Sequence, residues 1–181
     1  MHYRTANESD IPRLVKLYKA VAKTPGYIAR LEHEITDEYV SHFVHNSLKT
    51  GLIIVGESET DPEELIAEVH GYKSDLKGFG HVFGDVTFLV HPEHQGKGIG
   101  RTIFTIFLDE IVNTRPDIGK VELFTGEGNT RAIALYQSLG FMIEGRMEMR
   151  YWNPRTETYE ADIPLGWVNP NFEFDGDIPR L

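Results

Sequence analysis

The sequence predicts a mixed α/β fold in which a central sheet is flanked by helices. A β-branched and aromatic run at residues 86–90 indicates a buried strand, and a glycine-rich turn separates it from an amphipathic helix. A second strand, turn and helix follow over residues 121–139. Strands that alternate with helices are typical of a sheet with helices packed on its faces. The apolar residues of the first of these helices recur at helical spacing: Ile103, Phe104, Ile106, Phe107, Leu108, Ile111 and Val112.

The first half of the chain adds two helices and two strands to this prediction. Asn7 or Ser9 caps a helix that runs to about residue 23, and Thr24-Pro25-Gly26 ends it. The apolar face of this helix comprises Ile11, Leu14, Val15, Leu17, Tyr18 and Val21. The other expected elements are a helix at 38–49, strands at 52–56 and 65–72, and a glycine-containing loop at 74–84.

The second half of the chain ends in strands. Gly140 is a natural C-cap for the helix that begins at residue 129, and Phe141 starts another strand. Residues 151–156 have the character of a hairpin turn, and the last strand is expected over 159–165. Residues 1–166 therefore form one predicted domain. Residues 167–181 form an irregular tail, which lies on the surface or reaches a neighbouring subunit.

The composition excludes several classes of function. The 181 residues contain no cysteine, which excludes disulfides, cysteine-ligated metal and a cysteine acyl-enzyme. The net charge of −10 argues against nucleic-acid binding; it is compatible with a cationic substrate or simply with solubility. No run approaches the length of a membrane span, and the N-terminus lacks the apolar core of a secretion signal. We therefore expect a cytoplasmic protein with no membrane partner.

The turn Gln95-Gly96-Lys97-Gly98-Ile99-Gly100 is the strongest functional signal. It joins the strand at 86–90 to a helix, and the first amides of a helix form a natural site for phosphate. A Walker A loop needs Ser or Thr after Gly-Lys, where this chain has Gly98. The dinucleotide fingerprint also fails, because these glycines are spaced by two. The turn therefore predicts a phosphate ligand of another kind, or a glycine-rich helix start without a ligand.

Two segments carry a family resemblance. The spacing Gln-x-x-Gly-x-Gly resembles the pyrophosphate-binding motif of the GCN5-related N-acetyltransferase (GNAT) superfamily, which binds acetyl-CoA. The string Asn129…Ala132…Leu135-Tyr136…Gly140-Phe141 is similar to a second conserved segment of that superfamily. The two segments occur in the expected order, about one helix and strand apart. The resemblance implies the acetyltransferase fold for this chain.

The resemblance also implies a set of cofactor contacts. Asn129 would bond the pantetheine arm, and it is equally a good helix N-cap. Tyr136 would lie near the sulfur of CoA and act as general acid, although a tyrosine at this position can also be a core residue. The implied backbone contacts to acetyl-CoA come from Phe88, Leu89, Val90, Gln95, Gly96, Lys97, Gly98, Ile99, Gly100 and Arg101.

The general base and the acceptor pocket are less well defined. One branch of the superfamily has a glutamate where this chain has Gly84, so Asp85 would substitute only if the register shifts by one. Glu68 is a second candidate base. The rivals are Glu122, His70, His81, His91 and a chain of water molecules. The acceptor pocket is expected to be lined by Tyr27, Tyr72, Phe79 and His81.

No metal site is expected. His42 and His45 share a helix face, and His91 and His94 bracket Pro92-Glu93. Each pair supplies only two ligands, and the sequence offers no third residue near either of them.

The predicted activity is transfer of an acetyl group from acetyl-CoA to a primary amine, by direct attack in a ternary complex. The acceptor would be a small amine or a peptide, such as a protein N-terminus, and a homodimer is possible. A non-catalytic acyl-CoA sensor and an acyltransferase with a longer donor are the alternatives.

Overall fold

The computed structural model describes residues 1–24 and 27–173. Pro25 and Gly26 of the predicted helix-ending segment, and residues 174–181 of the predicted tail, lie outside the described residues. The helices are α1 (Ile11–Ala22), α2 (Asp37–Thr50), α3 (Ile99–Thr114) and α4 (Thr130–Ser138), with short 3-10 turns between elements. The strands are β1 (His2–Thr5), β2 (Leu52–Glu57), β3 (Leu65–Lys73), β4 (Val82–Val90), β5 (Lys120–Gly126), β6 (Met142–Ile143), β7 (Met147–Asn153) and β8 (Thr158–Val168).

One mixed sheet forms the centre of the molecule, which confirms the predicted fold class. Its strand order is β1-β2-β3-β4-β5-β8-β6, and β7 pairs with β8. The neighbouring strands are antiparallel except for β4 and β5, which are parallel. A parallel pair needs a crossover connection, and α3 provides it.

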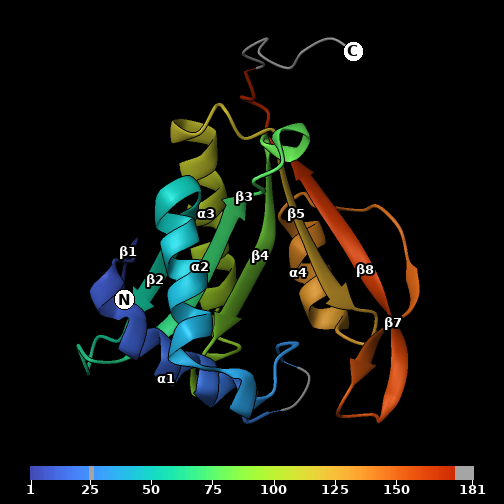
Figure 1. Cartoon of the computed structure of the whole chain (residues 1–181). Coiled ribbons are helices and arrows are strands. Elements are labelled where there is room, and N and C mark those ends of the chain that lie inside the picture. Colours follow the sequence, from blue (N-terminus) through green and yellow to red (C-terminus); the bar gives the residue numbers. More distant parts are fainter. Residues whose placement is uncertain (25–26, 174–181) are drawn as a thin grey trace.

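The parallel pair is very short. Only Val82 and Phe83 of β4 pair with β5, opposite Lys120 and Val121. Beyond Phe83 the two strands diverge, and Figure 1 shows the gap widening toward the end of β4. The other edge of β4 stays paired with β3 as far as Val90. The parting therefore leaves one backbone edge of β4 without a neighbouring strand.

Helices cover both faces of the sheet (Figure 1). On one face, α1 and α2 bury Leu14, Phe43 and Val44 against β2 and β3. On the other face, α3 contributes Phe104 and Phe107 to a core that it shares with Tyr136 of α4. Each helix buries one apolar stripe, as the spacing of its residues requires. No described helix is long and apolar enough to cross a lipid bilayer.

The described part of the tail lies against the domain. The side chain of Asn169 is buried and donates a 2.8 Å hydrogen bond to the carbonyl of Ile118. The ring of Phe172 packs against that of His81. These contacts hold the chain after β8 against the segment just before the start of β5.

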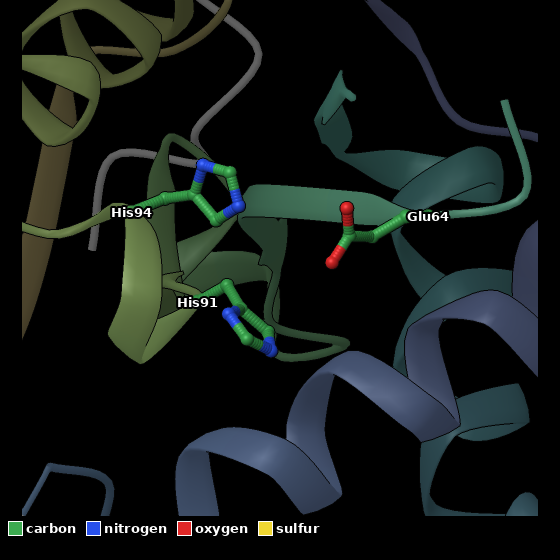
Figure 2. Close-up of side chains that lie close together, drawn as sticks. All are labelled: Glu64, His91 and His94. Atoms are coloured by element: carbon green, nitrogen blue, oxygen red, sulfur yellow. The ribbon is translucent and has the colours of Figure 1, made fainter. Parts of the chain in front are cut away.

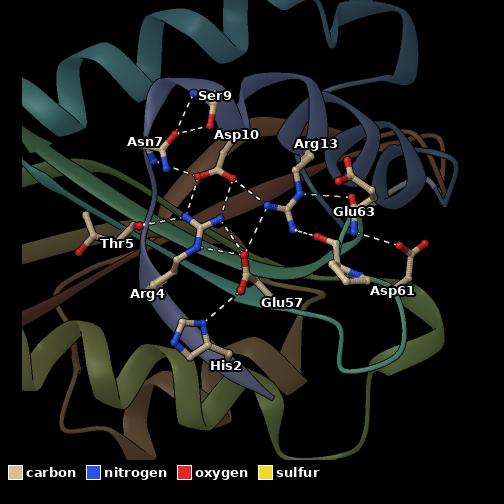
Figure 3. Close-up of polar contacts among 11 residues, drawn as sticks. His2, Arg4, Thr5, Asn7, Ser9, Asp10, Arg13, Glu57, Asp61 and Glu63 are labelled. Atoms are coloured by element: carbon tan, nitrogen blue, oxygen red, sulfur yellow. Dashed lines mark hydrogen bonds and ion pairs between the residues drawn. The ribbon is translucent and has the colours of Figure 1, made fainter.

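A polar network fastens the N-terminal strand and α1 to β2 (Figure 3). Arg4 donates two hydrogen bonds to the buried carboxylate of Asp10, at 2.7 and 2.8 Å, and others to Glu57. Arg13 of α1 contacts the same two carboxylates. It also donates to the backbone carbonyls of Pro62 and Glu63 in the turn between β2 and β3.

The network changes the acidity of Asp10. Burial by itself raises the pKa of this carboxyl, but hydrogen bonds from Arg4 and from the backbone N–H of Asn7 more than offset burial. The pKa of Asp10 is therefore lower than its ordinary value. A carboxyl with a lowered pKa in the folded state stabilises the fold above its unfolded-state pKa of about 3.9, and this contribution is lost as the pH falls.

We predict that Asp10→Asn lowers the free energy of unfolding at pH 7 by about 3 kcal/mol, because it leaves two arginines without their buried partner. The difference in unfolding free energy between the variant and the wild type should shrink between pH 4 and pH 2, because Asp10 of the wild type becomes protonated there. Urea unfolding at pH 7 and at acidic pH measures both effects. Asp109→Asn, on the exposed face of α3, is the matched control. If Asp10→Asn and Asp109→Asn lower the unfolding free energy equally, the stabilising role assigned to Asp10 is wrong.

Candidate active site

The glycine turn between β4 and α3 has the geometry of an anion site. Gly96 and Gly98 both adopt positive φ, +77° and +81°, a conformation that glycine tolerates at least cost. Gly98 precedes the first turn of α3, whose leading amides have no intrahelical partner. Gly100 lets the helix approach the sheet, because a Cβ there would lie 2.7 Å from the ring of Phe88. The sequence therefore brings free amides close to the end of β4.

A cavity of about 320 Å³ opens beside this turn. Its walls come from the end of β4, the glycine turn and the first turns of α4. They include most of the predicted cofactor residues: Phe88, Leu89, Val90, Gln95, Gly96, Gly98, Ile99, Gly100, Arg101, Asn129 and Tyr136. Lys97 is exposed and does not line the cavity.

Two basic residues that line this cavity were not predicted to contact the cofactor. Arg131, in the first turn of α4, lines it and lies close to Gly96. His94 lines it from the 3-10 turn that follows β4. The position of Arg131, two residues after Asn129, could have indicated its place in the cavity from the sequence. Arg101 and Arg131 thus supply positive charge to the cavity from two different helices.

A second cavity, of about 350 Å³, lies in the gap between β4 and β5. Its residues come from the segment after α1, from β4 and β5, and from the β7–β8 hairpin. They include Tyr27, Ile28, Ala29, Val86, Thr87, Phe124, Tyr151, Asn153, Arg155, Glu160 and Asp162. Of the four residues predicted for an acceptor pocket, Tyr27 is present here.

The two cavities meet at four residues, namely Tyr27, Phe88, Asn129 and Tyr136. Tyr136 packs edge-on against Phe88 and Phe104, and burial raises the pKa of its phenol well above the ordinary value. Within the part of the chain that the structure describes, no group bonds its hydroxyl. This hydroxyl therefore remains protonated near neutral pH and is available to a ligand that spans the junction.

The β7–β8 hairpin places two carboxylates in the second cavity. Glu160 accepts hydrogen bonds through Oε1 from Asn153 (2.7 Å) and Thr156 (3.2 Å). Its other oxygen, Oε2, is buried without a partner among residues 1–24 and 27–173. Buried carboxylate oxygens are normally bonded, so Oε2 of Glu160 is an exception among the described residues.

The second carboxylate, Asp162, has an altered acidity. Burial raises its pKa above the ordinary value, and Arg150 opposes that effect across 3.6 Å. Arg155, at the hairpin turn, adds an exposed guanidinium that forms no ion pair with any described residue. The cavity thus combines two acidic groups and one basic group within a small volume. The alternation of Glu160 and Asp162 along one strand face was a signal for the carboxylates.

The other residues predicted for the acceptor pocket lie elsewhere. Phe79 and His81 precede β4, at the end where it pairs with β5, whereas the cavities open at the other end. Tyr72 lies on the α1–α2 face beside His70. Phe79 and His81 belong to the loop that joins the start of β4, so they lie away from the gap at the end of β4.

The two predicted bases occupy different environments. Glu68 is fully buried on β3, where it accepts a 2.7 Å hydrogen bond from Tyr18 and contacts His70 at 2.8 Å. It lines neither cavity. Asp85 is exposed at a positive φ of 47°, one residue before Val86 of the second cavity. The buried set of Tyr18, Glu68 and His70 therefore connects α1 with β3 rather than facing the junction.

Comparisons with known proteins point to one family. Residues 14–141 match the profile of the acetyltransferase (GNAT) family. The chain is 27% identical to the L-amino acid N-acyltransferase MnaT of Escherichia coli, over 81% of this chain and 83% of that protein. It is 26% identical, with the same coverage, to an L-methionine sulfoximine/L-methionine sulfone acetyltransferase of Salmonella typhimurium.

A solved structure extends the likeness to the fold. The phosphinothricin acetyltransferase of Sinorhizobium meliloti, crystallised with acetyl-CoA, superposes with a TM-score of 0.82. The match covers 98% of this chain and 95% of that one at 15% sequence identity. This likeness supports the assignment of the sheet and its flanking helices.

We predict that Gly98→Glu weakens acetyl-CoA binding by at least about 100-fold, because a carboxylate would then compete for the amides of the glycine turn. Gly98→Ala imposes the same backbone strain, roughly 1–2 kcal/mol, without the charge, and should weaken binding far less. Gly78→Glu, where the added side chain meets open space, controls for the substitution. Calorimetric titration gives the constants, and equal affinities for all three variants would refute this location.

Proposed function

We propose that this chain, which belongs to the acetyltransferase (GNAT) family of acetyl-CoA-dependent N-acetyltransferases, acetylates the primary amine of a small acceptor by direct attack on the thioester. The observation that carries this proposal is the meeting of two cavities at Tyr136. One cavity suits a phosphate-bearing cofactor, and the other suits a small polar molecule. A thioester at the junction would be reached from both sides, as a ternary complex requires.

The cofactor contacts follow from the first cavity. The pyrophosphate would accept hydrogen bonds from amides of residues 95–101, with Arg101 and Arg131 nearby. The pantetheine arm would run along the unpaired edge of β4 at Phe88–Val90, and Asn129 would bond it from the other wall. The thioester carbonyl would then lie against backbone groups of β4, which can stabilise the tetrahedral oxyanion.

Tyr136 is the proposed general acid. Attack of the amine forms the carbon–nitrogen bond and a tetrahedral intermediate; collapse of this intermediate breaks the carbon–sulfur bond, and the departing thiolate needs a proton. The phenol of Tyr136 is protonated and lines the junction, so it would deliver that proton at the sulfur.

The proposed acceptor is an α-amino acid or a close analogue. Its ammonium group would face the carboxylates of Glu160 and Asp162, which line the second cavity, and its carboxylate would face Arg155. The names of the two curated relatives above, which concern L-amino acids and methionine derivatives, support the same class. Asp162 would also accept the proton that the ammonium must lose before attack, since burial brings its pKa closer to neutrality.

We predict that Tyr136→Phe lowers kcat by about 10²–10⁴-fold, the usual contribution of a general acid. The dissociation constant of acetyl-CoA should change little, because only one oxygen is lost. Free-thiol release measures turnover, and calorimetry measures binding. Tyr159→Phe, on the exposed side of the hairpin, is the matched control. Wild-type turnover in Tyr136→Phe would remove this residue from the mechanism.

We predict that Arg155→Ala raises KM for an amino acid with a free carboxylate by about tenfold, the value of one charged hydrogen bond. The KM for the corresponding amino acid amide should stay the same, because the amide has no carboxylate to lose. A panel of L-amino acids, their amides, a dipeptide and spermidine tests both statements. If spermidine is the best acceptor of the wild type and Arg155→Ala affects all acceptors equally, the amino-acid proposal fails.

A further inference from the structure

The structure brings a third potential metal ligand to the histidine pair beside the glycine turn. His91 is the N-cap of the 3-10 turn after β4, His94 is the last residue of that turn, and Glu64 directly precedes β3. The carboxylate and imidazole ligand atoms of these residues all lie within 4.8 Å of one another. Within residues 1–24 and 27–173, this is the one such group of three or more. Glu64 is 27 positions from His91 in the sequence, so no short motif joins them.

Figure 2 shows how the three side chains are arranged. The carboxylate of Glu64 points toward the two imidazoles from the opposite side of a shared gap. All three side chains are half-buried, so the gap is open to solvent and to an incoming ion. We propose that Glu64, His91 and His94 bind one divalent transition-metal ion, with Zn²⁺ as the best fit.

The chemistry of the ligands favours zinc. Two imidazoles and one carboxylate form a known zinc ligand set, and they leave a fourth position for water. Imidazole also selects against Mg²⁺ and Ca²⁺, which prefer oxygen ligands throughout. Zinc holds its ligands at about 2.0–2.2 Å, so the three groups must close by about an ångström, which side-chain rotation allows. His91 also accepts a long 3.4 Å contact from the N–H of Glu93, and giving this up costs little.

The backbone around each ligand is already fixed. The N–H of His91 donates to the carbonyl of Ile66 at 2.8 Å, and the N–H of His94 donates to the carbonyl of His91 at 2.9 Å. Glu64 is held on both sides, by a 3.0 Å bond to Asp61 and by a 3.0 Å bond from Ser58. Arg13 further secures the carbonyls of Pro62 and Glu63 to α1. The three ligands therefore need only side-chain adjustment to converge.

A bound ion would join the start of β3 to the turn that leads into α3. His94 also lines the cofactor cavity, so the ion would lie at its rim. The site is independent of the acceptor cavity and of Tyr136, and it stands even if the proposed acceptor is wrong.

The test is metal titration of the full chain, purified without a histidine tag and stripped with chelator. The wild type should bind one equivalent of Co²⁺, with visible absorption bands of a low-coordinate site, and Zn²⁺ should displace it. Zn²⁺ should also raise the Tm. Loss of a residue that only hydrogen-bonds a metal ligand lowers metal affinity by roughly 10–100-fold. Glu64→Gln and His94→Ala each alter a ligand itself, so each should weaken binding by at least that factor. The double variant His91→Ala/His94→Ala should abolish binding.

The matched control is His42→Ala/His45→Ala, which removes an equal number of histidines from α2. This variant should bind Co²⁺ and Zn²⁺ as the wild type does. Circular dichroism of each variant without metal verifies that the fold is retained. The proposal is overturned if the wild type binds no stoichiometric metal. It is equally overturned if the His91/His94 double variant retains the site, or if the α2 control loses it.

Discussion

The parting of β4 from β5 is the constraint on which the rest of this molecule depends. Two residue pairs hold the strands together, and beyond them the sheet opens into two arms. The features of the proposed acetyl transfer lie along that opening. The glycine turn closes one end of it, α4 brings Tyr136 and Asn129 to its middle, and the β7–β8 hairpin supplies charge on the far side.

An interrupted sheet needs other contacts to keep its two arms in place. On one side, α3 and α4 meet through the aromatic cluster of Phe104, Tyr136 and Phe141, which spans the gap from behind. On the other side, α1 and α2 pack on the β2–β4 arm, and the polar network of Arg4, Asp10, Arg13 and Glu57 ties α1 to it. We therefore propose that the acceptor enters through the face of the gap that α1 and α2 leave open.

The sequence predicted what short segments determine. The glycine turn, the helix that follows it and the Asn129–Phe141 segment each occupy a continuous stretch, so spacing alone indicates their structure. The positions of the other site residues depend on the pairing of strands that are distant in the sequence. Glu160 and Asp162 reach the gap only because β8 pairs with β5, and Glu64 meets His94 only because β3 pairs with β4. Phe79 and His81 were assigned to the acceptor pocket because the sequence does not tell at which end β4 and β5 part.

The open edge of β4 has a consequence for how this enzyme can change over time. In the proposed complex, the pantetheine arm takes the place of a missing strand, and on the β4 side it bonds to peptide groups rather than to side chains. Peptide groups are the same whatever residue is present. The chain can therefore replace side chains along Phe88–Val90 for packing reasons and still hold the cofactor. In the same proposal, specificity for the acceptor resides on the other arm, in the β7–β8 hairpin, which can diversify independently of the cofactor site.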